Sequence, residues 1–195
     1  DLTGEGEVTP GASTLENHGD LKRIGNNSPR YRVGLNLDAA WKGIDFSIFF
    51  QGVLKRDWMF DAGDPYFWGA GSGMWQAACF EEHMDYWTPE NTDAYYPKPY
   101  FNETKNQQAQ DAYMQKASYL RCKNIQLGYT LPTHITEKAG ISNCRIYLSC
   151  DNLFTITGLS SVYDPEVFGS YDGYGTSGKT YPLQRTISVG VNLNF

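Results

Sequence analysis

Tryptophan and tyrosine residues that could bind a ligand gather in two segments that are otherwise rich in turn residues. Pyranose rings present C–H faces that stack on Trp and Tyr, while nearby Asp, Asn and Gln side chains hydrogen-bond the sugar hydroxyls. The two segments therefore predict carbohydrate recognition. The candidates are Trp68, Trp75, Tyr86, Trp87, Tyr95 and Tyr96 in the first segment and Tyr163, Tyr171 and Tyr174 in the second. The competing interpretation is that the rings pack the segments against each other, and for Trp68 and Trp75 the two interpretations are nearly even.

The acidic and nucleophilic residues do not predict an enzyme. Glu81, Glu82 and Asp85 lie close together in one irregular segment. Glycosidase carboxylates must face each other across a sugar at about 5–9.5 Å, which neighbouring acids in a loop do not arrange. No Ser-His-Asp order is visible, and no cysteine lies near a histidine at zinc spacing. We therefore expect no catalytic residue, no metal and no cofactor. A surface glycosidase would require hydrolysis that a carboxylate substitution abolishes.

Composition favours an all-β protein that lies in one sizeable domain. The 195 residues include 20 Gly, 14 Tyr, 10 Phe and 5 Trp, and the net charge of −6 disfavours nucleic acid as a partner. No run approaches the roughly 18 apolar residues of a transmembrane helix, but membrane β-strands carry a much weaker hydropathy signal. The chain begins at Asp1 with no visible signal peptide, so we expect it to be a piece of a longer protein.

Alternating apolar and polar residues predict five amphipathic strands. The last strand is the clearest, because Ile187, Val189, Val191 and Leu193 alternate with polar or small residues up to Phe195. Ten residue steps tilted by about 45° rise roughly 23 Å, close to the apolar band of a membrane barrel. The predicted strands span residues 31–41, 44–53, 118–131, 144–155 and 184–195.

The third predicted strand contains a break in this pattern. Arg121 and Lys123 fall on the same parity as the apolar Ile125 and Leu127. On a lipid-facing surface near the bilayer centre, each cation would cost about 2–4 kcal/mol. Either the strand begins above the membrane, or a bulge reverses its parity.

The connections between the predicted strands alternate in length. Lys42-Gly43 and 132–143 are short, whereas 54–116 and 156–183 are long. Outer-membrane barrels have short periplasmic turns and long extracellular loops, and one orientation satisfies all four connections. Residues 1–30 are loop-like and are assigned to the extracellular side. Because about eight strands are the minimum for closure, strands from elsewhere in the polypeptide must complete such a barrel.

Several motifs resemble the C-terminal part of the TonB-dependent outer-membrane transporters of the SusC/RagA type. The resemblance runs from about Gly19 to Phe195. Its motifs are G-D-L-K-R-I-G-N-N-S-P-R-Y (19–31), W-K-G-I-D-F-S-I-F-F-Q-G (41–52), Y-W-T-P-E-N-T-D-A-Y-Y-P (86–97), S-Y-L-R-C-K-N-I-Q-L-G-Y-T-L-P (118–132), D-N-L-F-T (151–155), D-P-E (164–166) and Y-P-L-Q-R-T (181–186) with Phe195. A motif shared by transporters of different substrates favours a scaffold role for 86–97. Asp164-Pro165-Glu166 is expected to form a rigid turn that shapes the second long loop.

The resemblance implies a barrel of about 22 strands in the outer membrane, with long extracellular loops. It implies import of oligosaccharides or, less often, peptides, driven by the TonB complex through a plug that lies outside this chain. It also implies a lipoprotein lid of the SusD type, for which the exposed aromatic residues could be contacts. Phe195 would be the signal that the assembly machinery reads, and membrane lipids would cover the apolar strand faces.

A soluble or surface-attached, β-rich glycan-binding module is the alternative. In such a module the apolar rows would form the core of a sandwich. Burial of Val33, Leu35, Ile187 and Val189 against a second sheet of the same chain would exclude the barrel interpretation.

Overall fold

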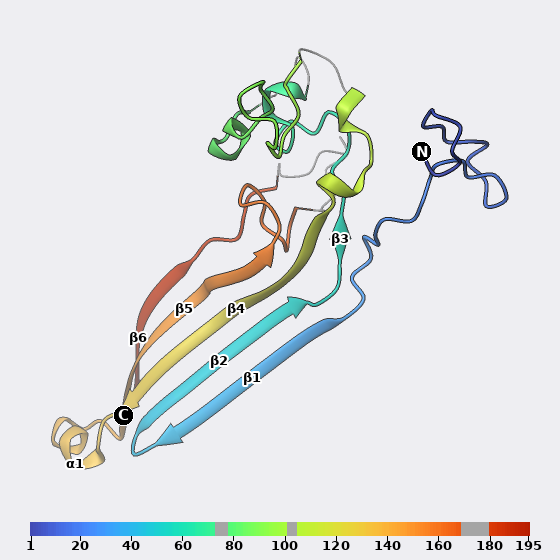
Figure 1. The fold of residues 1–195 in the computed structure, drawn as a ribbon. Coiled ribbons are helices and arrows are strands. Elements are labelled where there is room, and N and C mark those ends of the chain that lie inside the picture. The colour runs from blue at the N-terminus through green and yellow to red at the C-terminus, as the bar shows by residue number, and fades with distance from the viewer. Residues whose placement is uncertain (73–77, 101–104, 169–179) are drawn as a thin grey trace.

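The computed structural model describes residues 1–72, 78–100, 105–168 and 180–195, and these form one antiparallel sheet topped by irregular loops (Figure 1). The strand order is β1-β2-β4-β5-β6, and the short β3 pairs with β4 beyond the end of β2. The strands are β1 (Arg32–Trp41), β2 (Ile44–Val53), β3 (Asp57–Trp58), β4 (Gln115–Thr130), β5 (Asn143–Gly158) and β6 (Thr186–Asn194).

Helices in the described ranges are single turns. They are α1 (Thr133–Thr136) and the 3₁₀ helices η1 (Gly69–Gly71), η2 (Glu81–Met84), η3 (Lys105–Gln107), η4 (Asp111–Tyr113) and η5 (Glu137–Ala139). None of the helices in the described part of the chain has the length and apolar content needed to span a membrane.

Register aligns the amphipathic patterns of all five long strands into continuous rows. One row of directly paired residues is apolar and runs through Leu37, Ile48, Ile125, Cys150 and Ile187. The next row is polar and runs through Asp38, Ser47, Gln126, Ser149 and Ser188. Because alternate residues of a strand point to opposite faces, the sheet has one apolar face and one polar face.

The apolar face has no second sheet against it within the described residues. Leu35, Ile187 and Val189 are 52%, 67% and 75% exposed, and Val33 is half-buried. A soluble sandwich requires these side chains to be buried, and the described residues contain no second sheet that buries them. The face is instead suited to contact with lipid.

A bulge at Lys123 resolves the break in the third predicted strand. Phe49 pairs with Asn124 but Phe50 pairs with Cys122, so Lys123 is an extra residue opposite β2. Beyond the bulge, even-numbered residues of β4 take the apolar face and Arg121 moves to the polar face. The strand therefore avoids placing the guanidinium in lipid by reversing its parity.

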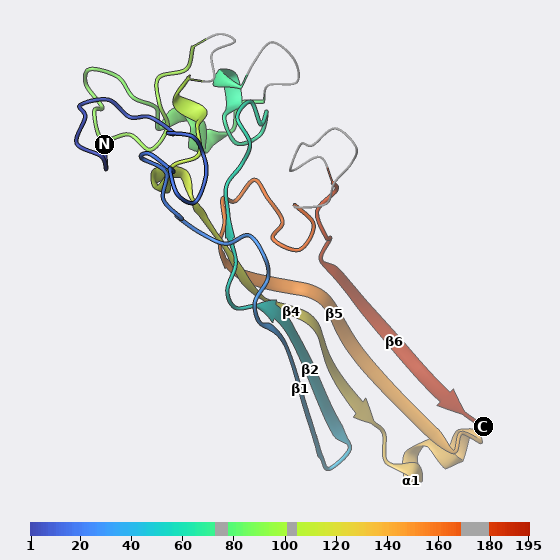
Figure 2. The same ribbon diagram turned by 90° about the vertical axis from the view of Figure 1, so that its right-hand side faces the viewer.

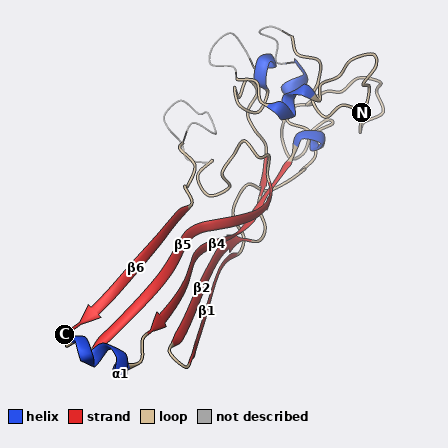
Figure 3. Ribbon diagram, turned by 90° about the vertical axis from the view of Figure 1, so that its left-hand side faces the viewer, coloured by secondary structure: helices blue, strands red, loops and turns tan. Residues whose placement is uncertain are grey.

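Both long loops lie at one end of the sheet, and the short connections lie at the other (Figures 1 and 2). The turn Lys42-Gly43 and the α1 segment lie at the same end as Phe195 (Figure 3). Long and short connections therefore alternate along the chain because they join the strands at opposite ends of the sheet. Strands β4 and β5 each have 16 residues, against 10 in β1 and β2, and their extra length reaches the loops.

Candidate functional site

Most of the buried hydrophobic residues of the described chain form one cluster in the long loops and at the loop end of β4. Phe60 stacks between Phe67 and Tyr163 at ring-centroid distances of 4.6 and 4.3 Å. The ring of Trp68 packs edge-on against Phe67 at 4.8 Å. The buried residues of this loop core are Phe60, Phe67, Trp68, Tyr96, Tyr113, Ala117, Leu159, Tyr163 and Phe168. Aromatic packing therefore joins the first long loop to the second.

Asp64 is the polar centre of the loop core. Its Oδ1 accepts hydrogen bonds from the Tyr163 hydroxyl at 2.8 Å and from the backbone N–H groups of Tyr66 and Phe67 at 3.0 and 2.9 Å. Burial, followed by the charge of Asp64, raises the pKa of Tyr163 far above its usual value. Tyr163 therefore remains a neutral donor that holds the two loops together.

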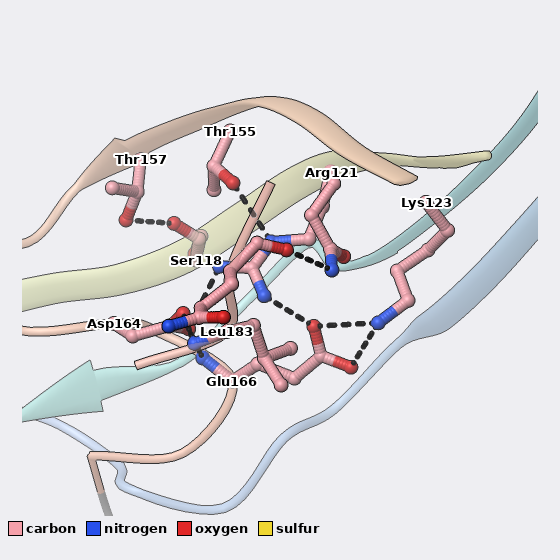
Figure 4. Close-up of polar contacts among 10 residues, drawn as sticks. Ser118, Arg121, Lys123, Thr155, Thr157, Asp164, Glu166 and Leu183 are labelled. Carbon is pink, nitrogen blue, oxygen red and sulfur yellow. Dashed lines mark hydrogen bonds and ion pairs between the residues drawn. The ribbon is translucent and has the colours of Figure 1, made fainter. Parts of the chain in front are cut away.

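Below the loop core, Arg121 joins strand β4 to the second loop (Figure 4). Its guanidinium donates to Asp164 Oδ1 and to Glu166 Oε2, both at 2.7 Å, and to Thr155 Oγ1 at 2.8 Å. Lys123 Nζ lies 3.1 Å from Glu166 Oε1. The side chains of Arg121 and Asp164 are only 4% and 6% exposed, and that of Glu166 is 20% exposed. We call the charged residues Arg121, Lys123, Asp164 and Glu166 the loop clamp.

The loop clamp also holds the returning end of the second loop. Asp164 Oδ2 accepts the backbone N–H of Leu183 at 3.0 Å, and Asp164 Oδ1 accepts that of Glu166 at 2.9 Å. Nearby, Asn152 has a positive φ of 51° and donates from its amide to the Gln184 carbonyl at 2.9 Å. The D-P-E and D-N-L-F-T motifs thus serve one purpose, because both fasten the second loop to the wall.

The predicted aromatic residues have different positions. Trp68, Tyr96 and Tyr163 are buried in the loop core, Tyr86 is half-buried, and Trp87 and Tyr95 are exposed. Burial also raises the pKa of Tyr96 and, less strongly, that of Tyr95. The buried rings of Trp68, Tyr96 and Tyr163 contact neighbouring aromatic side chains. Trp75, Tyr171 and Tyr174 lie outside the described residues.

A groove of about 410 Å³ brings aromatic and amide side chains together on the first loop. Trp87 and Tyr96 come from the predicted set, whereas Tyr100, Asn106 and Gln110 are residues that sequence reasoning missed. The residue types themselves were a usable signal, since the segment that follows Tyr100 is rich in Asn and Gln. An exposed ring beside amide groups can stack on a planar or pyranose ligand and bind its polar substituents.

Two of the acidic residues considered for catalysis, Glu82 and Asp85, hydrogen-bond to neighbouring loop residues. Glu82 Oε1 accepts the Ser160 hydroxyl at 2.6 Å, and Asp85 accepts hydrogen bonds from Asn91 and Tyr95. Within the described residues there is no group of His, Cys, Asp and Glu side chains that could hold a metal ion. These carboxylates therefore stabilise loop structure.

Comparisons with known proteins agree with the antiparallel sheet described above. The TonB-dependent receptor P3 of Formosa agariphila (strain DSM 15362 / KCTC 12365 / LMG 23005 / KMM 3901 / M-2Alg 35-1) is 30% identical over 202 residues, which cover all of this chain and 18% of the relative. The TonB-dependent receptor P26 of the same organism is 27% identical over 184 residues, which cover 90% of this chain and 18% of the relative. No family model matches the sequence.

Solved structures of the RagAB peptide importer contain a similar wall. The closed-closed state has a TM-score of 0.65 and 25% identity, covering 98% of this chain and 20% of that one. The open-open state has a TM-score of 0.63 and 28% identity, covering 87% and 17%.

The chain belongs to the SusC/RagA-type TonB-dependent transporters. It spans less than a fifth of the length of the curated relatives that it matches. Its antiparallel sheet corresponds to a segment of the transporter barrel, and the predicted all-β fold class is confirmed. The apolar face suits the outer, lipid-facing surface of such a barrel, and the polar face with the loop clamp suits its inner surface.

Proposed function

We propose that this chain forms a wall segment and two mouth loops of a TonB-dependent outer-membrane importer. The alternation of apolar and polar rows across five paired strands is the observation that carries the proposal, because it suits a wall between lipid and a polar lumen. The names of the relatives, TonB-dependent receptors and a peptide importer, support the same activity. The TonB complex would act through the part of the transporter outside this chain.

Both long loops are assigned to the extracellular side. This orientation leaves the turn at Lys42-Gly43 and the α1 segment in the periplasm, in keeping with the short periplasmic turns of membrane barrels. The loops then stand over the mouth of the barrel. A SusD-type lipoprotein is proposed as the lid that closes on them, and exposed aromatic residues such as Trp87 and Tyr95 suit such an interface.

Oligosaccharides are the proposed substrates, and the groove at Trp87 and Tyr100 is their proposed contact in this chain. Both rings are exposed and stand beside the amides of Asn106 and Gln110. Peptides are the second candidate substrate, favoured by the solved importer that shares the wall. Both ligand types can use aromatic stacking and amide hydrogen bonds, so the groove is compatible with either.

Uptake by living cells tests the proposal. Cells with the full transporter should import fluorescent oligosaccharides or peptides from a size-fractionated mixture, and loss of TonB should abolish that import. The double substitution Trp87→Ala/Tyr100→Ala should raise the half-saturating concentration roughly 10-fold or more, because each stacked ring contributes about 1 kcal/mol. Tyr181→Ala removes an exposed ring outside the groove and should leave uptake unchanged. Import that persists without TonB would contradict the function, whereas equal uptake by the double variant would exclude only the groove.

Phe195 is proposed as the assembly signal. Its side chain is 87% exposed, and the end of β6 is held by Ser142, which donates from its backbone N–H and its hydroxyl to the Asn194 carbonyl. Because Ser142 still holds the Asn194 carbonyl, deleting Phe195 should leave the sheet intact. Loss of the assembly signal should lower the amount of transporter in the outer membrane severalfold. Immunoblots of isolated outer membranes measure the amount, and heat-dependent gel mobility reports whether the remaining barrels are folded. Unchanged membrane levels would contradict the role.

A further inference from the structure

Five basic residues gather where β1 and β2 meet the loops. Arg32 lies in β1 and Arg56 follows β2, while Arg23, Arg30 and Lys55 occupy the adjoining loop segments. Two backbone hydrogen bonds align the segments: Arg30 N–H to the Lys55 carbonyl at 3.0 Å, and Asp57 N–H to the Asn26 carbonyl at 2.8 Å. We call Arg23, Arg30, Arg32, Lys55 and Arg56 the basic cluster.

The basic cluster has no carboxylate partners within the described residues. Five ion pairs form among the described residues, and none of them includes a member of the basic cluster. Asp57 is the one acidic residue that lines the adjoining pocket, and its Oδ2 already accepts the Asn26 N–H at 3.0 Å. The cluster therefore concentrates positive charge in a chain whose net charge is −6.

Arg56 is the most constrained cation of the cluster. Its guanidinium carbon lies 4.9 Å from the Trp58 ring and 4.8 Å from the Phe168 ring, and its Nε donates to the Asn27 carbonyl at 3.1 Å. Burial lowers the pKa of Arg56, and the charge of Arg32 lowers it further. Holding like charges close together costs free energy, and an anion placed among them would recover it.

A pocket of about 230 Å³ lies beside these cations and can accept a single acidic group. Arg23, Arg30 and Lys55 line it together with Asp57, Ile24, Gly25 and Asn26. Strand alternation places Arg32 on the polar face of the sheet. The hydrogen bond from Arg30 N–H to the Lys55 carbonyl continues the β1–β2 register two residues before Arg32, so Arg30 and Lys55 lie on the same face. Arg30, Arg32 and Lys55 therefore lie on the face that suits the lumen.

We propose that this pocket binds a carboxylate or sulfate group carried by the imported molecule. The proposal rests on the proposed function, and it narrows the substrate to an anionic one. Arginine is suited to this role, because its fork of N–H donors fits the two oxygens of a carboxylate or sulfate. An acidic sugar and an acidic peptide present the same chemistry, so the binding experiment must distinguish them.

Calorimetry on the purified full-length transporter tests the proposal with four probes. These are tetragalacturonate, a sulfated galactan tetrasaccharide, tetraglutamate and a neutral galactan tetrasaccharide. At least one anion should bind 10-fold or more tightly than the neutral sugar, and the strongest should identify the source of the charge. Arg30→Gln/Lys55→Gln should weaken that binding about 10-fold or more, since two charge-assisted contacts are lost. Both side chains are exposed, so the fold should persist.

A matched control removes the same charge from the opposite end of the sheet. Lys42→Gln/Lys138→Gln should leave anion binding unchanged, because both side chains are exposed near the short connections. Equal weakening by the two double variants would mean that only net charge matters and would overturn the site. Absence of binding by all three anions, or equal binding of the neutral sugar, would overturn it too. Purified protein needs no TonB, so anion binding without TonB-dependent uptake would contradict only the proposed function.

Discussion

Replacing Arg121 with methionine is expected to release the second loop from the barrel wall. The substitution leaves Glu166 with Lys123 as its cationic partner, whereas Asp164, which is 6% exposed, keeps only the backbone N–H groups of Leu183 and Glu166. Removing one member of a buried ion pair costs about 3–5 kcal/mol, because the remaining charge is still desolvated. Hydrogen–deuterium exchange of the full-length transporter should therefore accelerate at least 10-fold in peptides covering 163–168 and 181–185. Exchange equal to that of the unsubstituted transporter would contradict the role of the loop clamp.

Two further variants separate the loop clamp from general loss of charge. Arg145→Met removes a guanidinium that pairs with Asp45 on the same inner face near the short connections, and it should not affect exchange in the second loop. The triple variant Arg121→Met/Asp164→Asn/Glu166→Gln removes the buried carboxylates as well. It should recover part of the lost protection, since replacing both members of the buried Arg121–Asp164 pair costs less than orphaning one, and Lys123, which loses Glu166, is 24% exposed to solvent. No recovery would mean that Arg121 acts mainly through packing.

Gly52→Ala is expected to weaken the pairing of β2 with β4. Gly52 is buried and pairs with Leu120. A Cβ at this position would overlap the backbone carbonyl oxygen of Tyr119 and would approach Leu120 Cα to 3.1 Å. Backbone atoms cannot rotate away as a side chain can, so the strands must separate at a cost of about 1–3 kcal/mol. Thermal unfolding of the detergent-purified transporter, followed by gel mobility, should show a lower midpoint.

Gly34→Ala is the matched control in the neighbouring strand. A Cβ there would lie 3.6 Å from the Phe49 ring, which is ordinary van der Waals contact. The midpoint should stay unchanged or rise slightly, because alanine loses less backbone entropy on folding than glycine. Equal midpoints for the two variants would mean that the backbone contact at Gly52 relaxes without cost.

The sequence by itself determined that the strands form a sheet with one apolar face and one polar face. Strict alternation in segments such as Ile187 to Leu193 requires a sheet with one apolar face, whatever its neighbours are, because the side-chain period of a strand is two. Connection lengths predicted the separation of loops and turns to opposite ends. Both inferences use local properties of the chain, and local properties are what a single sequence contains.

Only the tertiary structure decided how the loops use their residues. The bulge at Lys123 depends on the pairing of β4 with both neighbours, and the carboxylate partners of Arg121 lie more than 40 residues away. Trp68 and Trp87 have the same side chain in the same loop, yet one is buried and the other exposed. Ring packing and long-range charge pairing bring together residues that no sequence spacing relates. For that reason the strand pattern predicted the barrel wall, whereas the loop clamp and the basic cluster emerged only from the folded chain.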